Sequence, residues 1–592
     1  MVSAATYALI GLGLSLLLTP LSRVAALRLG YVAGPTEDRW HQRPIALSGG
    51  VAVFLAVVVP FAVLQSVREI WVLVVSGALI FTVGLVDDVI SLKPAGKLVA
   101  QIVVASLLVF FGFRLQWVES LTVDVLLTLV WIVGITNALN LIDNMDGLCA
   151  GVGLIAIVAL LLGVGPQTGV TPTVLYLALL AGAMAGFLVY NVHPASVFLG
   201  DSGSLFIGLT LAAASLEFSQ YAVGSNLLST IAAPVLVLLI PIFDTTLVTM
   251  SRLWAGRPAS QGGLDHSSHR LVAIGLPERT AVAVLWILAS LGAAFGWSLG
   301  RGTGWSGLSA ALFVLAMILL AVYLAQVRVY KDQDGQVPVG KVTPFVVEFM
   351  YKRRIAEVIL DVCLVALAYY AAYALRFEGS QYQLNLRYFL ESLPIVVAVQ
   401  IAALYAVGAY RLAWKHFGLM DVVVLGKAVL LAIFVVIGVI VYMNRFENYS
   451  RAVFVIYDAF LILLLTASRA SFRLFGEFVQ RRRQGRRLII YGSGEHRSMV
   501  VRALLDGPTV YQMLGFVDDD HVNRGTRVQG YPVLGGHEQL VSLIQAGGVD
   551  NLVITGQVFD VDRLRELEGL CAHHGVGFSR FRYGLEEVVA VS

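Results

Sequence analysis

Charged residues are scarce in this chain of 592 residues, and their scarcity argues against several classes of protein. Asp, Glu, Lys and Arg make up only 13% of the sequence, with a formal net charge of +3. So small a positive charge, spread over many loops, argues against nucleic acid as a partner. Cysteine is scarcer still, because the chain has only Cys149, Cys363 and Cys571. These three are far apart and lack metal-ligand spacing, which argues against a disulfide framework and a zinc site.

Apolar residues dominate instead, at 58% of the sequence with a mean hydropathy of +0.81. Apolar runs of about 20 residues, each long enough to cross a bilayer, recur along the chain. The first run has neither a basic segment before it nor a small-residue cleavage site after it, so we expect a retained span. The sequence therefore predicts about fifteen transmembrane helices, near 4–27, 46–66, 69–86, 98–116, 121–139, 147–165, 172–190, 203–222, 229–250, 279–299, 306–326, 355–374, 388–409, 421–442 and 453–474.

Changes in composition predict the domain organisation. A polar stretch, VRVYKDQDGQVPVGKVTPF, follows the eleventh run and indicates a linker. After QRRRQGRR, short apolar strands alternate with amphipathic helical stretches, which is typical of an α/β domain. We expect a polytopic α-helical membrane protein with a C-terminal cytoplasmic Rossmann-like α/β domain. Its predicted parts are an eleven-span domain at 1–330, a linker at 331–350, a four-span domain at 351–480 and the α/β domain at 487–592.

The basic residues of the loops predict the orientation in the membrane. If the spans alternate, most of these residues fall on one side, which is then the cytoplasmic side. The opposite side receives little beyond Arg68, Arg114 and Arg301. We therefore expect a protein of the bacterial inner membrane, with its N-terminus outside and its C-terminal domain in the cytoplasm. The residues on the predicted cytoplasmic side are Arg23, Arg28, Arg39, Arg43, Lys93, Lys97, Arg252, Arg257, Arg270, Lys352, Arg353 and Arg354.

Four polar motifs lie at span ends or in loops on the predicted cytoplasmic side: GLVDDVISLKP, NALNLIDNMDGLCAG, YNVHPASVFLGDSGS and GGLDHSSHRL. An acid near a bilayer is costly and is usually kept for function. Five carboxylates at one interface would repel one another unless a cation joins them. Oxygen ligands without cysteine indicate a hard ion, Mg²⁺ (or Mn²⁺) with substrate phosphates. Nearby cationic side chains could neutralise a diphosphate, and the helix that opens at Gly203 and Ser204 could attract an anion at its N-terminus. This combination favours phosphoryl transfer to a lipid. The five acids are Asp87, Asp88, Asp143, Asp146 and Asp201.

These motifs, together with PIFDTTLVTMSRLWAGRP, resemble the polytopic polyprenyl-phosphate N-acetylhexosamine-1-phosphate transferases of the WecA/MraY family. The resemblance covers about residues 1–330. It implies that a polyprenyl phosphate, usually undecaprenyl phosphate, attacks the sugar-bearing phosphate of a UDP-N-acetylsugar. The products would be a polyprenyl-diphospho-sugar and UMP, with Mg²⁺ required, in the first membrane step of a cell-surface glycan pathway.

The resemblance also implies roles for individual residues. Asp87, Asp88 and Asp201 match the catalytic acids, with Asp201 as the principal Mg²⁺ ligand and Asp88 as a second. A base role for Asp87 is often proposed for the family, but a phosphate monoester has a second pKa of about 6, so we favour positioning over proton removal. Phe198 is available to stack on uracil. The implied substrate-binding residues are Lys97, Asn137, Asp143, Asp146, Asn191, Phe198, His266, His269 and Arg270.

The chain departs from the family pattern in two places. The peptidoglycan branch typically has a denser histidine cluster where this chain has DHSSHRL. That difference favours the branch that serves O-antigen, teichoic acid, capsule or other glycans, and it leaves the sugar open. Asn144 stands where versions with DGLDG have glycine, a change that we interpret as tolerated variation.

Residues 350–592 carry a second resemblance, through YKRRIAEVILDVCLVALAYYAAYALRFEG, GAYRLAWKHFGLMDVVVLGKAVLL and RRLIIYGSGEHRSMVVRALL. These segments are similar to the N-terminal half of CapD-type nucleotide-sugar 4,6-dehydratases. The catalytic domain that normally follows is not in this sequence, so we do not expect dehydratase activity. In YGSGEHR, the third glycine of the dinucleotide fingerprint is replaced by Arg497. Two functions of the α/β domain are therefore compatible with the sequence. It could bind a nucleotide, or it could be a regulatory domain that docks other glycan-assembly enzymes.

Two other functions compete with the transferase hypothesis. The first is a catalytically inactive membrane scaffold or nucleotide-sugar sensor, although a decayed core should lose at least one of its acids. The second is a transporter, which would place polar residues within the spans rather than at their ends. We also expect a homodimer.

Overall fold

The computed structural model describes most of the chain, in ranges that exclude part of the predicted linker. They are 3–34, 44–64, 70–220, 227–254, 263–300, 306–325, 327, 342–377, 380–411, 417–445, 449–482, 485–492, 500, 501, 504, 511–520, 525–528, 530–555 and 561–581. The chain divides into a helical unit within residues 1–468 and a second unit that holds the α/β domain within 469–592. The predicted boundaries near 330, 350 and 480 stay predictions, and helix α14 (Val342–Arg376) begins inside the range predicted as a linker.

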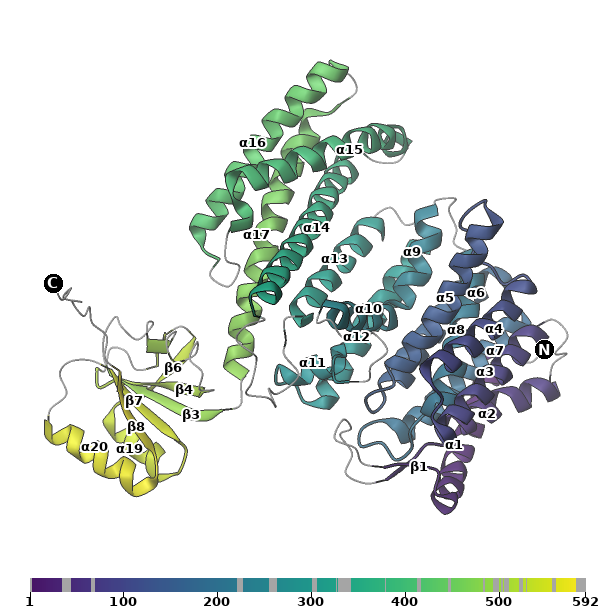
Figure 1. The fold of residues 1–592 in the computed structure, drawn as a ribbon, viewed down its shortest axis with the longest axis horizontal. Helices are drawn as coiled ribbons and strands as arrows, with labels where there is room; N and C mark the ends of the chain where they lie inside the picture. Colours follow the sequence, from purple (N-terminus) through teal and green to yellow (C-terminus); the bar gives the residue numbers. More distant parts are fainter. Residues whose placement is uncertain are drawn as a thin grey trace. The chain divides into compact units, whose positions relative to one another are not determined.

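Long apolar helices build the membrane part of the protein (Figure 1). Besides α14, they are α1 (Ala4–Leu29), α2 (Gly49–Leu64), α3 (Trp71–Ile90), α4 (Pro94–Phe110), α5 (Leu121–Leu141), α6 (Leu148–Thr168), α7 (Pro172–Asn191), α8 (Gly200–Gln220), α9 (Leu227–Val237), α10 (Leu239–Trp254), α12 (Glu278–Gly300), α13 (Ser306–Ala325), α15 (Ser380–Val407), α16 (Leu419–Asn444) and α17 (Arg451–Arg482). The short α11 (Ser267–Ala273) lies between α10 and α12 in the chain.

The helices confirm the predicted fold class. Among the described residues, ten helices are long and apolar enough to cross a membrane, and the α9–α10 pair makes an eleventh. Three shorter apolar helices, α2, α4 and α6, lie at the second, fourth and sixth predicted spans. Helix α8 lies at the eighth, where Asp201 and Glu217 lower its apolar character.

The ninth predicted span is wrong in one respect, because it is not a continuous helix. Helices α9 and α10 meet at Leu238 with a bend of 80°. Pro241 lies in the first turn of α10, where its ring and its missing N–H exclude a helical bond to the carbonyl of Val237. The bend turns Asp244 of α10 away from the axis of α9 and places it beside α11.

Helix α7 is the buried centre of the first eight helices. The side chain of Thr171 caps its first turn by accepting a hydrogen bond from the Val174 N–H, and Pro172 follows at the first helical position. Helix α1 packs along α7 at very short range. A Cβ atom added to Gly182 would clash with the carbonyl oxygen of Ala8. Only glycine permits this approach, which is the small-residue packing typical of membrane helices.

The second unit contains a six-stranded sheet in the order β5–β6–β4–β3–β7–β8. Its strands are β3 (Arg486–Tyr491), β4 (Tyr511–Val517), β5 (Arg527–Val528), β6 (Tyr531–Gly535), β7 (Asn551–Thr555) and β8 (Gly577–Phe581). All neighbours pair in parallel except β5 and β6. Helices α19 (His537–Gln545) and α20 (Val561–His574) cover one face through Leu540, Ile544 and Leu567. The first strand, β3, is central with later strands on both sides, which confirms the predicted Rossmann-like arrangement.

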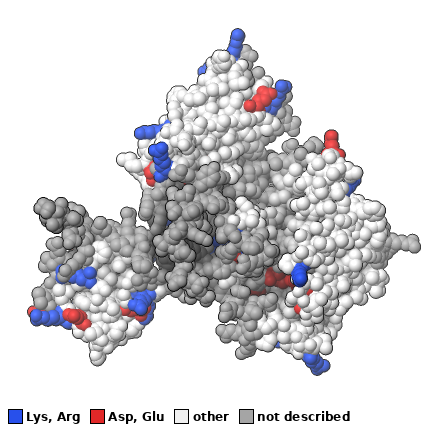
Figure 2. Space-filling model, viewed as in Figure 1, with Lys and Arg blue, Asp and Glu red and all other residues white. Residues whose placement is uncertain are grey.

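The two units differ in the charge of their surfaces, as expected from their compositions. Figure 2 shows that the described surface of the helical part is mostly uncharged, with a few scattered charged side chains, whereas the α/β domain carries both signs. The apolar surface of the helices suits contact with lipid, and the mixed charge of the α/β domain suits contact with water.

Candidate active site

Lys97 is the centre of a cluster that joins three of the predicted motifs. Its Nζ lies 2.8 Å from Asp87 Oδ2 and 2.5 Å from Asp201 Oδ2. It also donates a hydrogen bond of 3.0 Å to Asn140 Oδ1. The four side chains come from the end of α3, the first turn of α4, the end of α5 and the first turn of α8. The structure thus brings Asp87 and Lys97 together with Asp201, which belongs to a different motif of the sequence.

Asn140 fixes the orientation of Asp201 from the other side. Its Nδ2 donates to Asp201 Oδ1 at 2.7 Å and to Ser204 Oγ at 2.9 Å. Because Asn140 accepts from Lys97 with its oxygen and donates with its nitrogen, each end of the carboxamide has a defined partner. Asp87 is fixed as well, since its Oδ1 accepts from the Leu92 N–H at 2.7 Å. The carboxylate–lysine cluster is therefore pre-organised by hydrogen bonds from neighbouring helices.

Asp88 binds the start of helix α8 with both carboxylate oxygens. Oδ1 accepts from the Asp201 N–H at 2.8 Å, and Oδ2 accepts from the Ser202 N–H at 3.0 Å. Helix α3 reaches this point because Gly84 leaves room; a Cβ there would lie 2.5 Å from the Asp201 carbonyl oxygen. These contacts favour a role for Asp88 in holding Asp201 in place over its predicted role as a metal ligand. They also move the start of α8 from the predicted Gly203 to Gly200.

The donor set of the cluster fits a hard divalent cation. The carboxylates of Asp87 and Asp201 contact one ammonium group, and with the nearby Asp88 the four side chains carry a formal net charge of two negative. Asp87 and Asp201 already share one cation, Lys97 Nζ, and both are oxygen donors of the type that Mg²⁺ prefers. Among the residues that the structure describes, no group of three or more His, Cys, Asp or Glu side chains converges as metal ligands. A bound Mg²⁺ is therefore a proposal.

Asn137 and Asn191 have buried partners that indicate scaffold roles. Asn137 exchanges two hydrogen bonds with Gln101 and so joins α5 to α4, and its predicted contact with a nucleotide stays a prediction. Asn191, which is 3% exposed, accepts from the Gly147 N–H and donates to the Val197 carbonyl oxygen. It ties the turn after α5 to the segment before α8. Both residues hold the walls of the site in position.

Asp146 also joins these two segments. Its Oδ2 accepts from the Ala195 N–H at 2.9 Å and lies 3.0 Å from His193 Nδ1. Phe198 is held through its backbone, which bonds to Ala46 and Gly49. The predicted roles of Asp146 and Phe198 at the nucleotide stay predictions. So does that of Asp143, which is half-buried in the turn after α5.

The histidine motif is organised by Asp244 of α10. Asp244 is 1% exposed; its Oδ1 accepts from both the N–H and the hydroxyl of Ser267, and its Oδ2 lies 2.7 Å from His266 Nδ1. Because a carboxylate can only accept, Nδ1 of His266 carries the proton, and Nε2 is the atom that can meet a substrate. The His269 ring lies 6.1 Å from that of His266.

Arg270 makes buried contacts with backbone carbonyl groups. It is 3% exposed, and its Nε donates to the Asp265 carbonyl oxygen at 2.7 Å. Its Nη1 donates to the carbonyl oxygens of Leu324 at 2.7 Å and Val327 at 3.1 Å. A guanidinium placed at the C-terminal carbonyls of α13 stabilises that helix end. These partners favour a structural role in which Arg270 anchors α11 against α13, and its predicted role at the diphosphate stays a prediction.

The sequence interpretation missed three residues of this region. Asn140 lies three residues after Asn137, on the same helix face, but it is Asn140 that bonds Asp201. Asp244 was detectable as an acid inside the apolar run LIPIFDTTLVTM, where a charge is costly. Tyr31 lies beside Asp88, and burial together with the charge of Asp88 raises the pKa of its phenol, which stays protonated at neutral pH.

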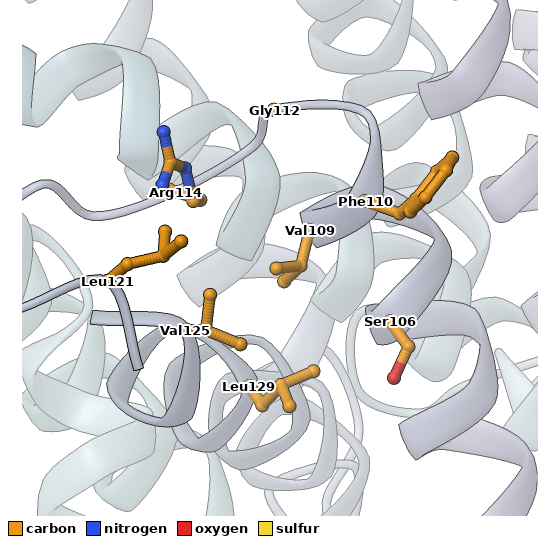
Figure 3. Close-up of a pocket in the computed structure, with 8 residues that line it drawn as sticks. All are labelled: Ser106, Val109, Phe110, Gly112, Arg114, Leu121, Val125 and Leu129. Carbon is orange, nitrogen blue, oxygen red and sulfur yellow. The ribbon is translucent and has the colours of Figure 1, made fainter. Parts of the chain in front are cut away.

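A cavity of about 450 Å³ between α4 and α5 lies away from these residues. It is formed by the C-terminal end of α4 and the N-terminal end of α5, whereas Lys97 and Asn140 lie at the opposite ends of the same helices. Its lining is mostly apolar, with Arg114 at one side (Figure 3). The lining residues are Ser106, Val109, Phe110, Gly112, Arg114, Leu121, Val125 and Leu129.

The helices and the carboxylate–lysine cluster define a polytopic membrane protein with an acidic site at its helix ends. Residues 70–219 match the family described as glycosyl transferase family 4. A probable undecaprenyl-phosphate N-acetylglucosaminyl 1-phosphate transferase of Bacillus subtilis is 33% identical over 317 residues, which is 52% of this chain and 86% of the relative. The chain therefore belongs to glycosyl transferase family 4, the WecA/MraY family of phosphosugar transferases.

Other relatives and a second match complete this picture. A decaprenyl-phosphate N-acetylglucosaminephosphotransferase of Mycolicibacterium smegmatis is 37% identical over 301 residues, or 45% of this chain and 74% of the relative. A phospho-N-acetylmuramoyl-pentapeptide-transferase of Halalkalibacterium halodurans is 33% identical over 198 residues, or 29% of this chain and 60% of the relative. Residues 405–579 match a family described as a CoA-binding domain, which covers helices α16 and α17 and the Rossmann-like sheet up to β8.

Proposed function

We propose that the protein transfers N-acetylglucosamine 1-phosphate, or a related N-acetylhexosamine 1-phosphate, from a UDP-sugar to a polyprenyl phosphate. An oxygen of the lipid phosphate attacks the phosphorus that bears the sugar. The bond from that phosphorus to the bridging oxygen breaks, and UMP leaves with the bond electrons. The observation that carries this proposal is the cluster of Asp87, Lys97, Asn140 and Asp201, in a chain whose relatives are named for the same transfer.

The residues of the cluster divide the work of positioning and charge neutralisation. Lys97, held between Asp87 and Asp201, supplies a fixed positive charge beside which the lipid phosphate can lie. The lipid phosphate is mostly deprotonated at neutral pH, because its second pKa is about 6, so no strong base is needed. Asp87 therefore orients Lys97. His266, oriented by Asp244, offers Nε2 to the diphosphate of the UDP-sugar from the α11 side.

We infer that Asp201 and Asp87 hold Mg²⁺ (or Mn²⁺) when substrates are bound. The ion would supply charge stabilisation at the phosphate oxygens. Support comes from the oxygen-only donors and from the net negative charge that Lys97 alone does not cancel. In this proposal Asp88 does not bind the ion. It holds the first turn of α8, from which Asp201 projects.

We further propose that the cluster faces the cytoplasm of a bacterium, with the N-terminus outside the inner membrane. The support is the excess of basic residues in the loops on the side of Lys97 and Arg252. A homodimer and the docking of other glycan-assembly enzymes on the α/β domain are part of this proposal. Cysteine-accessibility labelling in intact cells tests the orientation: a cysteine at Ala95 should react only after the membrane is permeabilised.

The central test is turnover by the full chain in lipid vesicles. Undecaprenyl phosphate, Mg²⁺ and a panel of UDP-N-acetylsugars are supplied, and released UMP and the mass of the lipid product are measured. We expect UMP and a polyprenyl-diphospho-sugar with at least one sugar of the panel. Asp201→Asn is the matched control for contaminating activity. A chain that binds UDP-sugars but releases no UMP would instead be the inactive scaffold or sensor.

A further inference from the structure

Asn144 and Ser268 form a direct contact between two parts of the site that are far apart in the sequence. The Ser268 hydroxyl donates to Asn144 Oδ1 at 2.7 Å. Asn144 is itself oriented, because its Nδ2 donates to the Leu141 carbonyl oxygen at 3.0 Å. Ser268 is fully buried at 0% exposure. The contact is therefore a defined hydrogen bond between the turn after α5 and helix α11.

Each end of this bond is attached to a different part of the candidate active site. On one side, Asn144 follows Asn140, which bonds both Lys97 and Asp201. On the other side, Ser268 follows His266 and Ser267, which are bound to Asp244. Other hydrogen bonds of α11 lead to Asp244 of α10, to Asp265 and to the C-terminal end of α13. The bond between Asn144 and Ser268 thus connects the carboxylate–lysine cluster to the histidine helix.

We propose that Asn144 and Ser268 act as a latch that sets the spacing between these two parts, and that they are positioning residues for the UDP-sugar. The inference rests on the proposed function, in which the diphosphate lies between the cluster and His266. A displacement of about 1 Å between groups that grip one substrate costs substantial binding and rate. The Ser268 end of the latch is buried and the Asn144 end is half-buried, so loss of the bond removes the partner of the carboxamide oxygen and lets α11 shift relative to the cluster.

The identity of the two side chains suits a latch more than a contact with phosphate. Neither carries a charge, so the bond between them does not compete for the cation or the phosphates of the substrate. The serine hydroxyl donates its hydrogen bond to Asn144, and both ends of the Asn144 carboxamide have partners inside the protein. The latch therefore acts on the substrate indirectly. On one side it positions His266, and on the other it positions Asn140, which holds the Lys97 and Asp201 side chains.

The test measures equilibrium binding of UDP-N-acetylglucosamine to the full chain, followed by KM values for this sugar nucleotide and for undecaprenyl phosphate. Ser268→Ala and Asn144→Ala should each weaken binding and raise the KM for the sugar nucleotide about two- to tenfold, the loss expected for one neutral hydrogen bond. The KM for the lipid should not change. The double variant should be no worse than either single variant, because both remove the same bond. Ser268→Thr, which keeps the hydroxyl, should restore binding.

A matched control and the contrary outcomes separate this inference from a general loss of stability. Ser290→Ala removes an exposed serine hydroxyl bond within α12, to the Trp286 carbonyl oxygen, and should leave binding unchanged. Effects of the two single variants that multiply in the double variant, or equal increases in both KM values, would overturn the latch. Failure of the wild type to release UMP would refute the proposed function alone, because the binding measurement still decides about the latch.

Discussion

Asp88→Asn changes one atom of the candidate site and tests how the start of α8 is held. Both oxygens of Asp88 accept backbone N–H groups, from Asp201 at 2.8 Å and from Ser202 at 3.0 Å. A carboxamide keeps one acceptor and replaces the other with an NH₂ donor. That donor would face a backbone N–H, and the negative charge at the N-terminus of α8 would be lost. The first turn of α8, which carries Asp201, should therefore shift.

The size of the effect follows from the bond that is lost. A hydrogen bond to a charged acceptor contributes about 1.5–3 kcal/mol. If the loss of this hydrogen bond raises the free energy of the transition state by about 2 kcal/mol relative to the bound substrates, kcat falls roughly thirtyfold. The Asp201 carboxylate itself stays in the protein, with its bonds to Lys97 and Asn140. The Mg²⁺ concentration that gives half-maximal activity should therefore change little.

The assay is UMP release by the full chain in vesicles, across a series of Mg²⁺ concentrations. A variant of Asp88 whose activity recovers at high Mg²⁺ would show that Asp88 is a metal ligand, which refutes the positioning role. Wild-type kcat at every concentration would refute it as well. Asp124→Asn is the control, since Asp124 also accepts a backbone N–H, that of Trp117, but at the opposite end of α5 from Asn140.

Three further predictions address the metal site, the histidine helix and the α/β domain. Asp201→Asn should abolish UMP release while the thermal unfolding curve stays cooperative; wild-type activity at ordinary Mg²⁺ would contradict the ligand role. Asp244→Asn should lower kcat/KM by about 10²-fold, because His266 loses its orienting carboxylate, and an unchanged value would contradict that role. The Arg487 guanidinium lowers the pKa of Asp550 to about 2. The ionised Asp550 therefore stabilises the folded α/β domain fully above the unfolded pKa of about 4, and this contribution is lost as the pH falls toward 2. Asp550→Asn should therefore flatten the pH dependence of α/β-domain unfolding between pH values of about 4 and 2, whereas an unaltered profile would exclude this pair as its source.

The sequence predicted the helices well because each span is encoded locally. A run of about 20 apolar residues has few alternatives in a membrane, so its position follows from composition alone. The break at Leu238 was missed because the run 229–250 stays apolar across it. Pro241 was the available signal, since proline lacks an N–H and removes the helical hydrogen bond to the carbonyl of Val237.

The candidate site was predicted less completely, because its contacts are between distant segments. Motif order identified Asp87, Lys97 and Asp201, but no periodicity distinguishes Asn140, which bonds Asp201, from Asn137, which bonds Gln101. Both carboxamides lie on one face of α5, and only the packing of α4 and α8 against that face separates them. For the same reason Arg270 looked like a phosphate ligand in the sequence, although its partners are carbonyl groups at the end of α13.

The position of Asp88 also changes how phosphate binding should be understood. A helix N-terminus is a ready site for an anion, and the start of α8 was expected to bind substrate phosphate. In the structure this position already holds an anion, because Asp88 accepts the N–H groups of Asp201 and Ser202. The phosphates of the substrates must then be neutralised by other groups. Lys97 supplies one positive charge beside the carboxylates of Asp87 and Asp201, so we expect the binding of two further anionic substrates to need an additional cation. The internal capping of α8 is thus a structural reason to expect that activity depends on a divalent metal ion.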